Sequence, residues 1–155
     1  MFTVKPASEE VVPKYSSGYQ TKEFFDNAYD GSGEGAYGAD AISAISAHHL
    51  LIADEIARLF NSVGDKKTKQ VVLLSPNHFS VGVSAAQITK ESWDTPYGIL
   101  ETDSKAVDVL LDTVEVLKDE DLAFENEHGI GALTPFIKRS FPDAKLIPII
   151  LHESL

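Results

Sequence analysis

Apolar and polar positions along residues 41–151 follow two different periods. Four short, continuous apolar runs predict buried strands: 41–47, 71–74, 85–89 and 144–151. Parallel strands that are covered on both faces have such continuous apolar sequences. Apolar residues spaced three and four apart predict helices near 50–62, 103–113 and 132–140. This alternation predicts an α/β domain with a mostly parallel sheet and helices on both of its faces.

Residues 1–40 lack such a pattern. The stretch YDGSGEGAYGAD contains four glycines and favours a flexible or loosely packed N-terminal arm, followed by one domain over 41–155. Five aromatic residues still indicate some packing, since disordered tails seldom carry so many: Tyr15, Tyr19, Phe24, Phe25 and Tyr29. The alternative is an arm that packs on a partner or on a missing domain.

Composition narrows the class of protein. The chain of 155 residues has no cysteine, which excludes disulfides and thiolate metal sites and fits a reducing, cytoplasmic compartment. Its net charge of −11 repels nucleic acid and anionic membrane surfaces, so neither is expected as a partner. No apolar run is long enough to span a membrane, and the first residues do not resemble a secretory signal. A homo-oligomer is compatible with these features.

The histidines carry the candidate chemistry. Each of four lies where a predicted strand or loop meets the next element: His48 or His49, His78, His128 and His152. Because ligands of open α/β sheets bind beyond the carboxyl ends of the strands, these imidazoles are expected near one edge. Two imidazoles with a carboxylate and open positions suit iron(II), or zinc. The alternative is that they are loop histidines with only hydrogen-bonding roles.

The choice between the two adjacent histidines stays open. In an extended chain His48 and His49 point to opposite faces, so at most one of them is a direct ligand. The other would hydrogen-bond the backbone or line the rim of the site.

Four segments in this order resemble the Memo family, also called AmmeMemoRadiSam system protein B, which is itself similar to class III extradiol ring-cleaving dioxygenases. They are SAHHLL, LLSPNH, WDTPYG and NEHGIGALTPFIKRSFPDAKLIPII, within 41–151. The resemblance implies that His48 and His78 are metal ligands and that His128 is a catalytic histidine outside the metal's own ligands. It also implies a divalent metal ion, with iron(II) as the first candidate. We expect His49, Asn77 and Glu127 to line the pocket or to serve as alternative ligands.

This chain departs from the family pattern in several places. Ala47 stands where the family has proline, and Gly131 stands where it has a second glutamate. Family members continue well beyond this length and carry a third metal ligand there, so the resemblance implies an N-terminal half with an incomplete site. His152 or Glu153 could replace that ligand.

Two functions follow from the resemblance as expectations. One is metal-dependent chemistry of the ring-cleaving type on a small aromatic molecule. The other is a non-enzymatic module that binds a peptide or a metal. If the chain is a half domain, the apolar strand predicted over 145–151 should have a flank that nothing in this chain covers.

Overall fold

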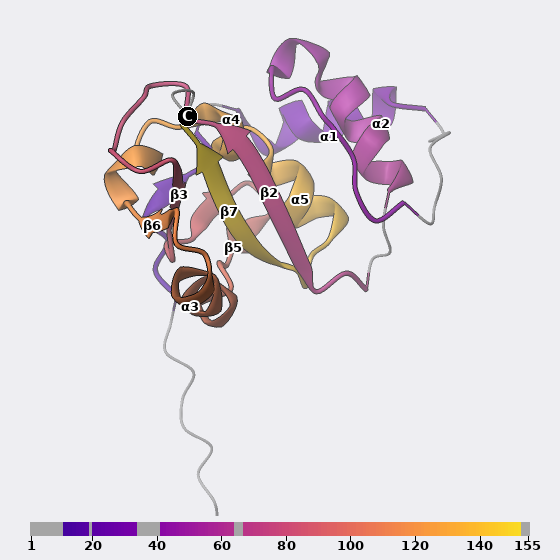
Figure 1. The fold of residues 1–155 in the computed structure, drawn as a ribbon. Helices are drawn as coiled ribbons and strands as arrows, with labels where there is room; N and C mark the ends of the chain where they lie inside the picture. The colour runs from indigo at the N-terminus through magenta and orange to yellow at the C-terminus, as the bar shows by residue number, and fades with distance from the viewer. Residues whose placement is uncertain (1–10, 19, 34–40, 64–66, 153–155) are drawn as a thin grey trace, which may run out of the picture.

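The computed structural model describes residues 11–18, 20–33, 41–63 and 67–152. Its main sheet has four strands in the order β2-β7-β3-β6 (Figure 1). Their bounds are β2 Gln70–Pro76, β3 Ala86–Ile88, β6 Leu117–Asp119 and β7 Lys145–Leu151. The strands predicted at 71–74, 85–89 and 144–151 are therefore confirmed.

The pairing of these strands is mixed. Strands β2 and β7 are parallel over seven residue pairs, from Gln70↔Lys145 to Pro76↔Leu151, and β3 is parallel to β6. The contact between β3 and β7 is antiparallel. The class is α/β as predicted, with two of the three pairings parallel.

A second, three-stranded sheet has the order β1-β4-β5, and the hydrophobic pattern did not predict it. Its strands are β1 Tyr15–Ser16, β4 Trp93–Thr95 and β5 Gly98–Leu100. The turn signals in WDTPYG connect β4 to β5, and Gly98 has a φ of 99°, which glycine adopts without strain. Strands of two or three residues are too short to show a period.

The helices complete the layers. The longer ones are α1 Lys22–Gly31, α2 Ala53–Ser62 and α3 Ser104–Thr113; the shorter ones are η1 Leu50–Ile52, η2 Asp121–Phe124, α4 His128–Gly131 and α5 Thr134–Ser140. Caps fix two of the starts, because the side chains of Thr21 and Asp103 accept backbone N–H groups of α1 and α3. The three helices predicted from the sequence are confirmed.

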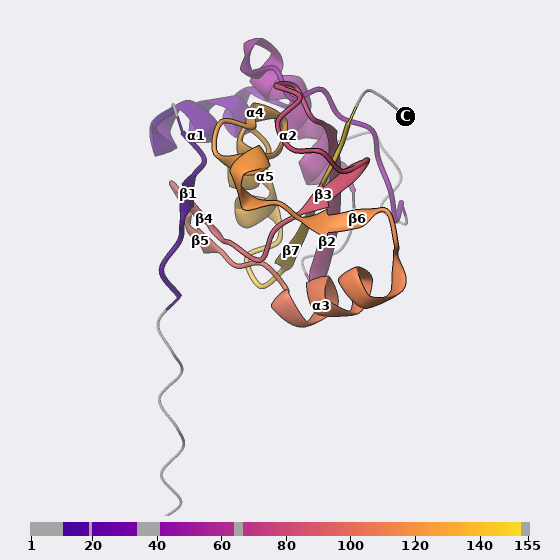
Figure 2. The same cartoon turned by 60° about the vertical axis from the view of Figure 1, so that its left-hand side comes forward.

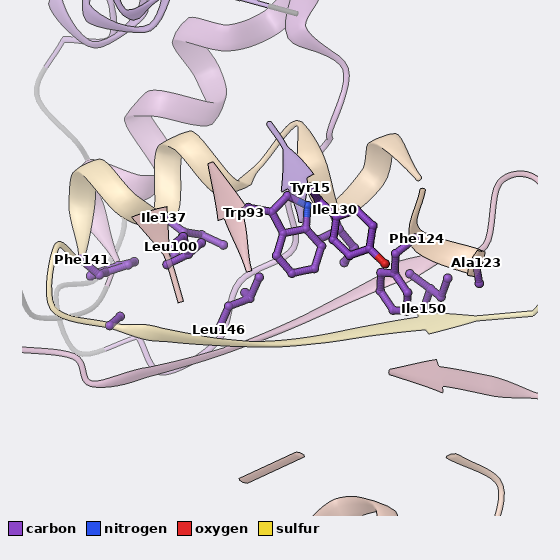
Figure 3. Close-up of a cluster of buried hydrophobic side chains, with 11 residues drawn as sticks. Tyr15, Trp93, Leu100, Ala123, Phe124, Ile130, Ile137, Phe141, Leu146 and Ile150 are labelled. Carbon is purple, nitrogen blue, oxygen red and sulfur yellow. The ribbon is translucent and has the colours of Figure 1, made fainter. Parts of the chain in front are cut away.

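Helices lie on both faces of β7. Figure 3 shows α5 and the small sheet on one side of this strand and a helix on the other. Leu146 and Ile150 point toward Trp93 in the first layer, whereas Ile147 packs with Val107 of α3 in the second. Each such fully buried side chain contributes roughly 1.5–3 kcal/mol of transfer free energy.

The described part of the N-terminal segment is packed against the domain. Phe25, Ala28 and Tyr29 of α1 are buried against α2 and α5, and the phenol of Tyr15 donates to the backbone oxygen of Asp121. The expectation of a loose arm therefore does not hold for α1. The predicted boundary at residue 40 stays a prediction, and Tyr19 and residues 34–40 lie outside the described residues.

Residues 41–47 do not form a strand, so that prediction is wrong. Ile42 and Ile45 are 101% and 99% exposed. These two isoleucines are three residues apart, which gives neither an alternating apolar stripe nor a continuous apolar run on a sheet. The alanines and serines between them offer little apolar surface to bury. The segment runs extended past α2 toward the site.

The expected uncovered flank also lies elsewhere. Leu146, Ile147 and Ile150 of β7 are buried. Most of the exposed apolar surface here belongs to the neighbouring strand β2, where Val72 is 57% and Leu74 is 60% exposed, and on β7 itself the last residue, Leu151, is 41% exposed. Strand β2 is at the end of the sheet, and the hydrophobic cluster of α3 includes Ile147 of β7 but no residue of β2. Figure 2 shows α3 on the opposite side of the molecule from α1 and α2. Among the described residues, no helix is long and apolar enough to cross a membrane.

Candidate metal centre

Three imidazoles converge at one edge of the main sheet. Each of His48, His78 and His128 offers a ring nitrogen, and these nitrogens lie within 4.8 Å of one another. The ring centroids are 4.6 Å apart for His48 and His78, 5.3 Å for His48 and His128, and 4.3 Å for His78 and His128. The predicted convergence of these residues is therefore present in the structure. We call them the histidine cluster.

Each histidine arrives on a different segment. His78 lies two residues after Pro76, the last residue of β2. The backbone N–H of Asn77, between them, donates to the carbonyl of Leu151 of β7 at 2.8 Å. His128 is the first residue of α4. His48 comes from the extended segment before η1 and not from a strand end. Only His78 thus reaches the cluster by the strand-end geometry that the sequence suggested.

Glu127 fixes the orientation of His78. Its Oε1 accepts a hydrogen bond from Nδ1 of the imidazole at 2.7 Å, and its Oε2 accepts the backbone N–H of the same residue at 2.9 Å. Oε1 also accepts the N–H of Gly129 at 2.6 Å. With its proton on Nδ1, His78 presents the lone pair of Nε2, as metal-binding histidines do.

The carboxylate of Glu127 is itself fully buried. An unpaired charge in such a place would be costly, and the three N–H donors around it compensate for the lost water. Since both oxygens are occupied, Glu127 holds a ligand in place and is not free to act as one. Its position directly before His128, as the N-cap of α4, is the sequence signal for this role.

Close packing restricts the same corner. A Cβ atom on Gly129 would lie 2.0 Å from Oγ of Ser75 and 2.8 Å from Cε1 of His78. Such distances do not occur between real atoms, so a glycine is needed for α4 to start this close to the end of β2.

The environment keeps His48 neutral. Partial burial, with the neighbouring rings of His78 and His128, lowers the pKa of His48 below its ordinary value, because desolvation and nearby positive charge disfavour imidazolium. A neutral imidazole is the form that binds a metal.

The donor set fits a transition-metal ion. Imidazole nitrogens suit zinc, iron, copper and nickel. A tetrahedral ion with bonds of about 2.1 Å holds its nitrogens about 3.4 Å apart. The nitrogens of the cluster lie within 4.8 Å of one another, so a shared ion requires the rings to move closer together, and His128 is exposed.

Other predicted residues lie outside the cluster. His49 is exposed, and its Nδ1 accepts the N–H of Leu51 at 3.4 Å, so His48 is the member of the pair that enters the site. Asn77 is buried; its amide group donates to the carbonyl of Val81 at 2.7 Å and shapes the loop after β2. His152 is not part of the cluster. Glu153 lies outside the described residues.

A cavity of about 500 Å³ adjoins the cluster at His128. Tyr15, Trp93 and Phe124 form an aromatic wall, with ring centroids of neighbouring pairs 5.1 to 6.4 Å apart. Glu125 and the segment 16–18 complete much of the lining. This volume is typical of sites that bind small molecules. The sequence did not predict it, because β1 and β4 belong to the small sheet that escaped prediction.

Comparison with known proteins points to one family. A family model described as "Memo-like protein" matches residues 22–154. A MEMO1 family protein of Caldivirga maquilingensis is 39% identical over 85 residues, which are 55% of this chain and 30% of that protein. One from Pyrobaculum aerophilum is 28% identical over 117 residues, or 74% of this chain and 42% of that protein.

The matched part of the chain therefore spans less than half the length of these curated relatives. The matched region of the family model includes all three residues of the histidine cluster and the glutamate that orients His78. Because the family model matches most of the chain, the chain belongs to the family of Memo-like proteins.

Proposed function

We propose that the histidine cluster binds a divalent metal ion, iron(II) first, in a non-haem site related to that of ring-cleaving dioxygenases. The observation that carries the proposal is the convergence of three imidazoles, one of them oriented by a buried carboxylate. When bound, iron would supply Lewis acidity and one-electron chemistry.

The chain's own residues have separate tasks in this proposal. Glu127 holds the ring of His78 so that Nε2 faces the centre of the cluster. His48 offers a neutral imidazole. His128 borders the cavity and either binds the metal or moves a proton to and from the substrate, as the sequence suggested.

The cavity supports a small aromatic molecule, rather than a peptide, as the substrate. Its aromatic wall suits the face or edge of a flat ring, and its volume holds a molecule of that size.

Anaerobic loading with iron(II), followed by metal analysis and a catechol assay with dioxygen, tests the proposal. We expect about one iron per chain and catechol-dependent oxygen uptake. His78→Ala should lose the iron, and His49→Ala, next to the cluster but outside it, should retain it. Equal iron content in both variants would contradict the site.

The role of His128 can be separated by His128→Gln. If this residue is a ligand, iron affinity falls; if it moves protons, affinity stays and only turnover falls. Either result assigns the residue, whereas unchanged affinity and turnover would remove it from the site.

A second candidate function, metal binding without ring cleavage, is favoured by the ligand types. Non-haem oxygenases typically use two histidines and one carboxylate, whereas three imidazoles are a common zinc set. Among the described residues, the nearest carboxylate, that of Glu127, is occupied by N–H donors. Preference for zinc over iron in a competition measurement, with no oxygen uptake, would favour this second function.

A further inference from the structure

The charges that line the cavity beside the histidine cluster limit the charge that its ligand can carry. Among the described residues, the acidic and basic side chains of the lining are Lys14, Glu125, Glu127 and His128. A charged group of a ligand is held best by an opposite charge that has no other partner, because a paired charge must first give up its partner. The partners of these four side chains therefore indicate the charge of the ligand.

The ammonium group of Lys14 is already paired. Its Nζ donates to Oδ2 of Asp121 at 3.0 Å, and the other oxygen of that carboxylate accepts the hydroxyl of Thr89. An anionic ligand would have to compete with Asp121 for this ammonium group. Lys14 thus does little to favour an acidic ligand.

Glu127 and His128 offer no free negative charge. Both oxygens of Glu127 are occupied by N–H donors, and the carboxylate is fully buried. His128 carries a charge only when it is protonated, and that charge is positive. Neither side chain can therefore serve as the partner of a cationic ligand.

Glu125 differs from the other three. It is exposed, and no hydrogen bond or ion pair of its carboxylate is found among the described residues. The backbone on both sides of it is held in place, since its N–H donates to the carbonyl of Leu122 at 3.4 Å and the N–H of Glu127 donates to that of Phe124 at 3.3 Å. A negative charge without a partner thus belongs to the cavity lining at a fixed point of the chain.

The aromatic wall adds contact area without adding charge. Figure 3 shows Tyr15 between Trp93 and Phe124, and none of the three residues is more than 7% exposed, so the wall is packed before a ligand arrives. The hydroxyl of Tyr15 already donates to the backbone oxygen of Asp121. The net charge of −11 favours the approach of a cation over that of an anion.

We propose that this cavity binds an aromatic molecule that carries a protonated amine, and that the carboxylate of Glu125 selects for this charge. The proposal rests on the proposed function, because it takes the same cavity as the place of the substrate, and it adds the charge of that substrate. In an arylalkylamine, the ring packs on the aromatic wall and the ammonium group pairs with Glu125. An aromatic acid would be repelled by the same carboxylate.

Three probes of nearly equal size separate charge from shape: phenylethylamine, phenylethanol and phenylpropanoate. Trp93 is the only tryptophan of the chain and lines the cavity, so its fluorescence reports binding. At low salt, with a chelator and no added metal, we expect a Kd on the order of 1 mM for the amine. The alcohol should bind about two- to fivefold more weakly and the propanoate more weakly still, and high salt should reduce both differences.

Two variants and one control test the part played by Glu125. Glu125→Gln should weaken binding of the amine about two- to fivefold and leave that of the alcohol unchanged. Lys14→Gln should tighten binding of the amine, because it leaves the carboxylate of Asp121 without its cation. Glu115→Gln is the matched control, since Glu115 is also exposed but does not line the cavity, and it should bind all three probes like the parent. Circular dichroism checks the fold of each variant.

The proposal is overturned by any of three results. These are binding of the alcohol or the propanoate by the parent chain at least as tightly as the amine, equal binding of the amine by the parent and Glu125→Gln, or no fluorescence change with the amine at about 20 mM, where a complex of the expected affinity would be nearly saturated.

His78→Ala separates this proposal from the proposed function. His78 is not among the residues that line the cavity, so this variant should lose iron and still bind the amine like the parent. A parent chain that binds no iron but prefers the amine would contradict the proposed function alone. A parent chain that binds iron without preferring the amine would contradict the role of Glu125 alone.

Discussion

The carboxylate of Glu127 binds His78 twice, through the ring Nδ1 at 2.7 Å and through the backbone N–H at 2.9 Å. One side chain thus fixes both the position and the rotation of the imidazole. This double contact joins the start of α4 to the end of β2, so the geometry of the histidine cluster and the packing of these two elements depend on each other.

Glu127→Gln should lower both the metal affinity of the cluster and the stability of the fold. The amide cannot accept from all three N–H donors around it, so one buried donor loses its partner. We expect metal affinity to fall about 10–100-fold and unfolding free energy to fall by about 1–3 kcal/mol. Calorimetric metal titration and urea unfolding measure the two effects. Glu125→Gln, on an exposed neighbour, should change neither; equal effects in both variants would contradict this role.

Gly129→Ala should displace the same corner by steric overlap. Its Cβ would meet Oγ of Ser75 at 2.0 Å, and relief requires α4 or β2 to shift. We expect a loss of about 1–3 kcal/mol in unfolding free energy, together with weaker metal binding. Gly31→Ala is the control, because nothing lies within 4 Å of the added atom there. Full stability of Gly129→Ala would show that the corner is looser than described.

Tyr15 should make stability depend on alkaline pH. Burial raises its pKa to about 12, because the phenolate is disfavoured out of water. Between its usual value of about 10 and this raised value, the folded protein keeps the proton that the unfolded chain loses. The stabilisation is therefore complete below pH 10 and is lost as pH rises through 12, by up to about 2–3 kcal/mol.

The variant Tyr15→Phe tests this titration. It loses the hydrogen bond to the carbonyl of Asp121, which should cost about 1 kcal/mol at neutral pH. Between pH 9 and 12 its unfolding free energy should fall less steeply than that of the parent chain. Chemical unfolding at a series of pH values measures both slopes; identical slopes would mean that Tyr15 does not titrate as argued.

Phe136→Ala should show how strongly α1 is held. The ring of Phe136 is fully buried and lies 5.1 Å from that of Phe25 and 5.8 Å from that of Tyr29. Its removal should cost about 3–5 kcal/mol. Val109→Ala, at an exposed position, should cost almost nothing. Urea unfolding measures the unfolding free energy of both variants. A small loss in Phe136→Ala would indicate that α1 and α5 move together to fill the space left by the ring.

The sequence predicted the elements that are long enough to show a period. The continuous apolar runs of β2 and β7 and the spacing of α2 and α3 were sufficient for the α/β class. The small sheet was missed because its strands have two or three residues. The antiparallel contact of β3 with β7 was missed because a buried strand has the same apolar pattern in either direction.

The expectation that histidines at strand ends form the site applies to only some of the residues in the cluster. His78 does follow a strand, but His48 reaches the cluster on a segment that was wrongly expected to be one. The resemblance to Memo proteins implied a ligand role for His48, which stays a prediction; the structure shows that His48 lies in the cluster. The orienting role of Glu127 depends on a contact across 49 residues of sequence, which no local pattern reports.

The separate origins of the three histidines have a consequence for the order of folding. His48, His78 and His128 are about thirty and fifty residues apart along the chain, so an unfolded chain must close two long loops to bring them together. A partly folded chain with only β2 and α4 docked offers two imidazoles and holds an ion weakly. If the cluster binds a metal ion as proposed, tight binding would therefore follow the placement of the segment before η1, and a bound ion would report that the chain has reached its final architecture.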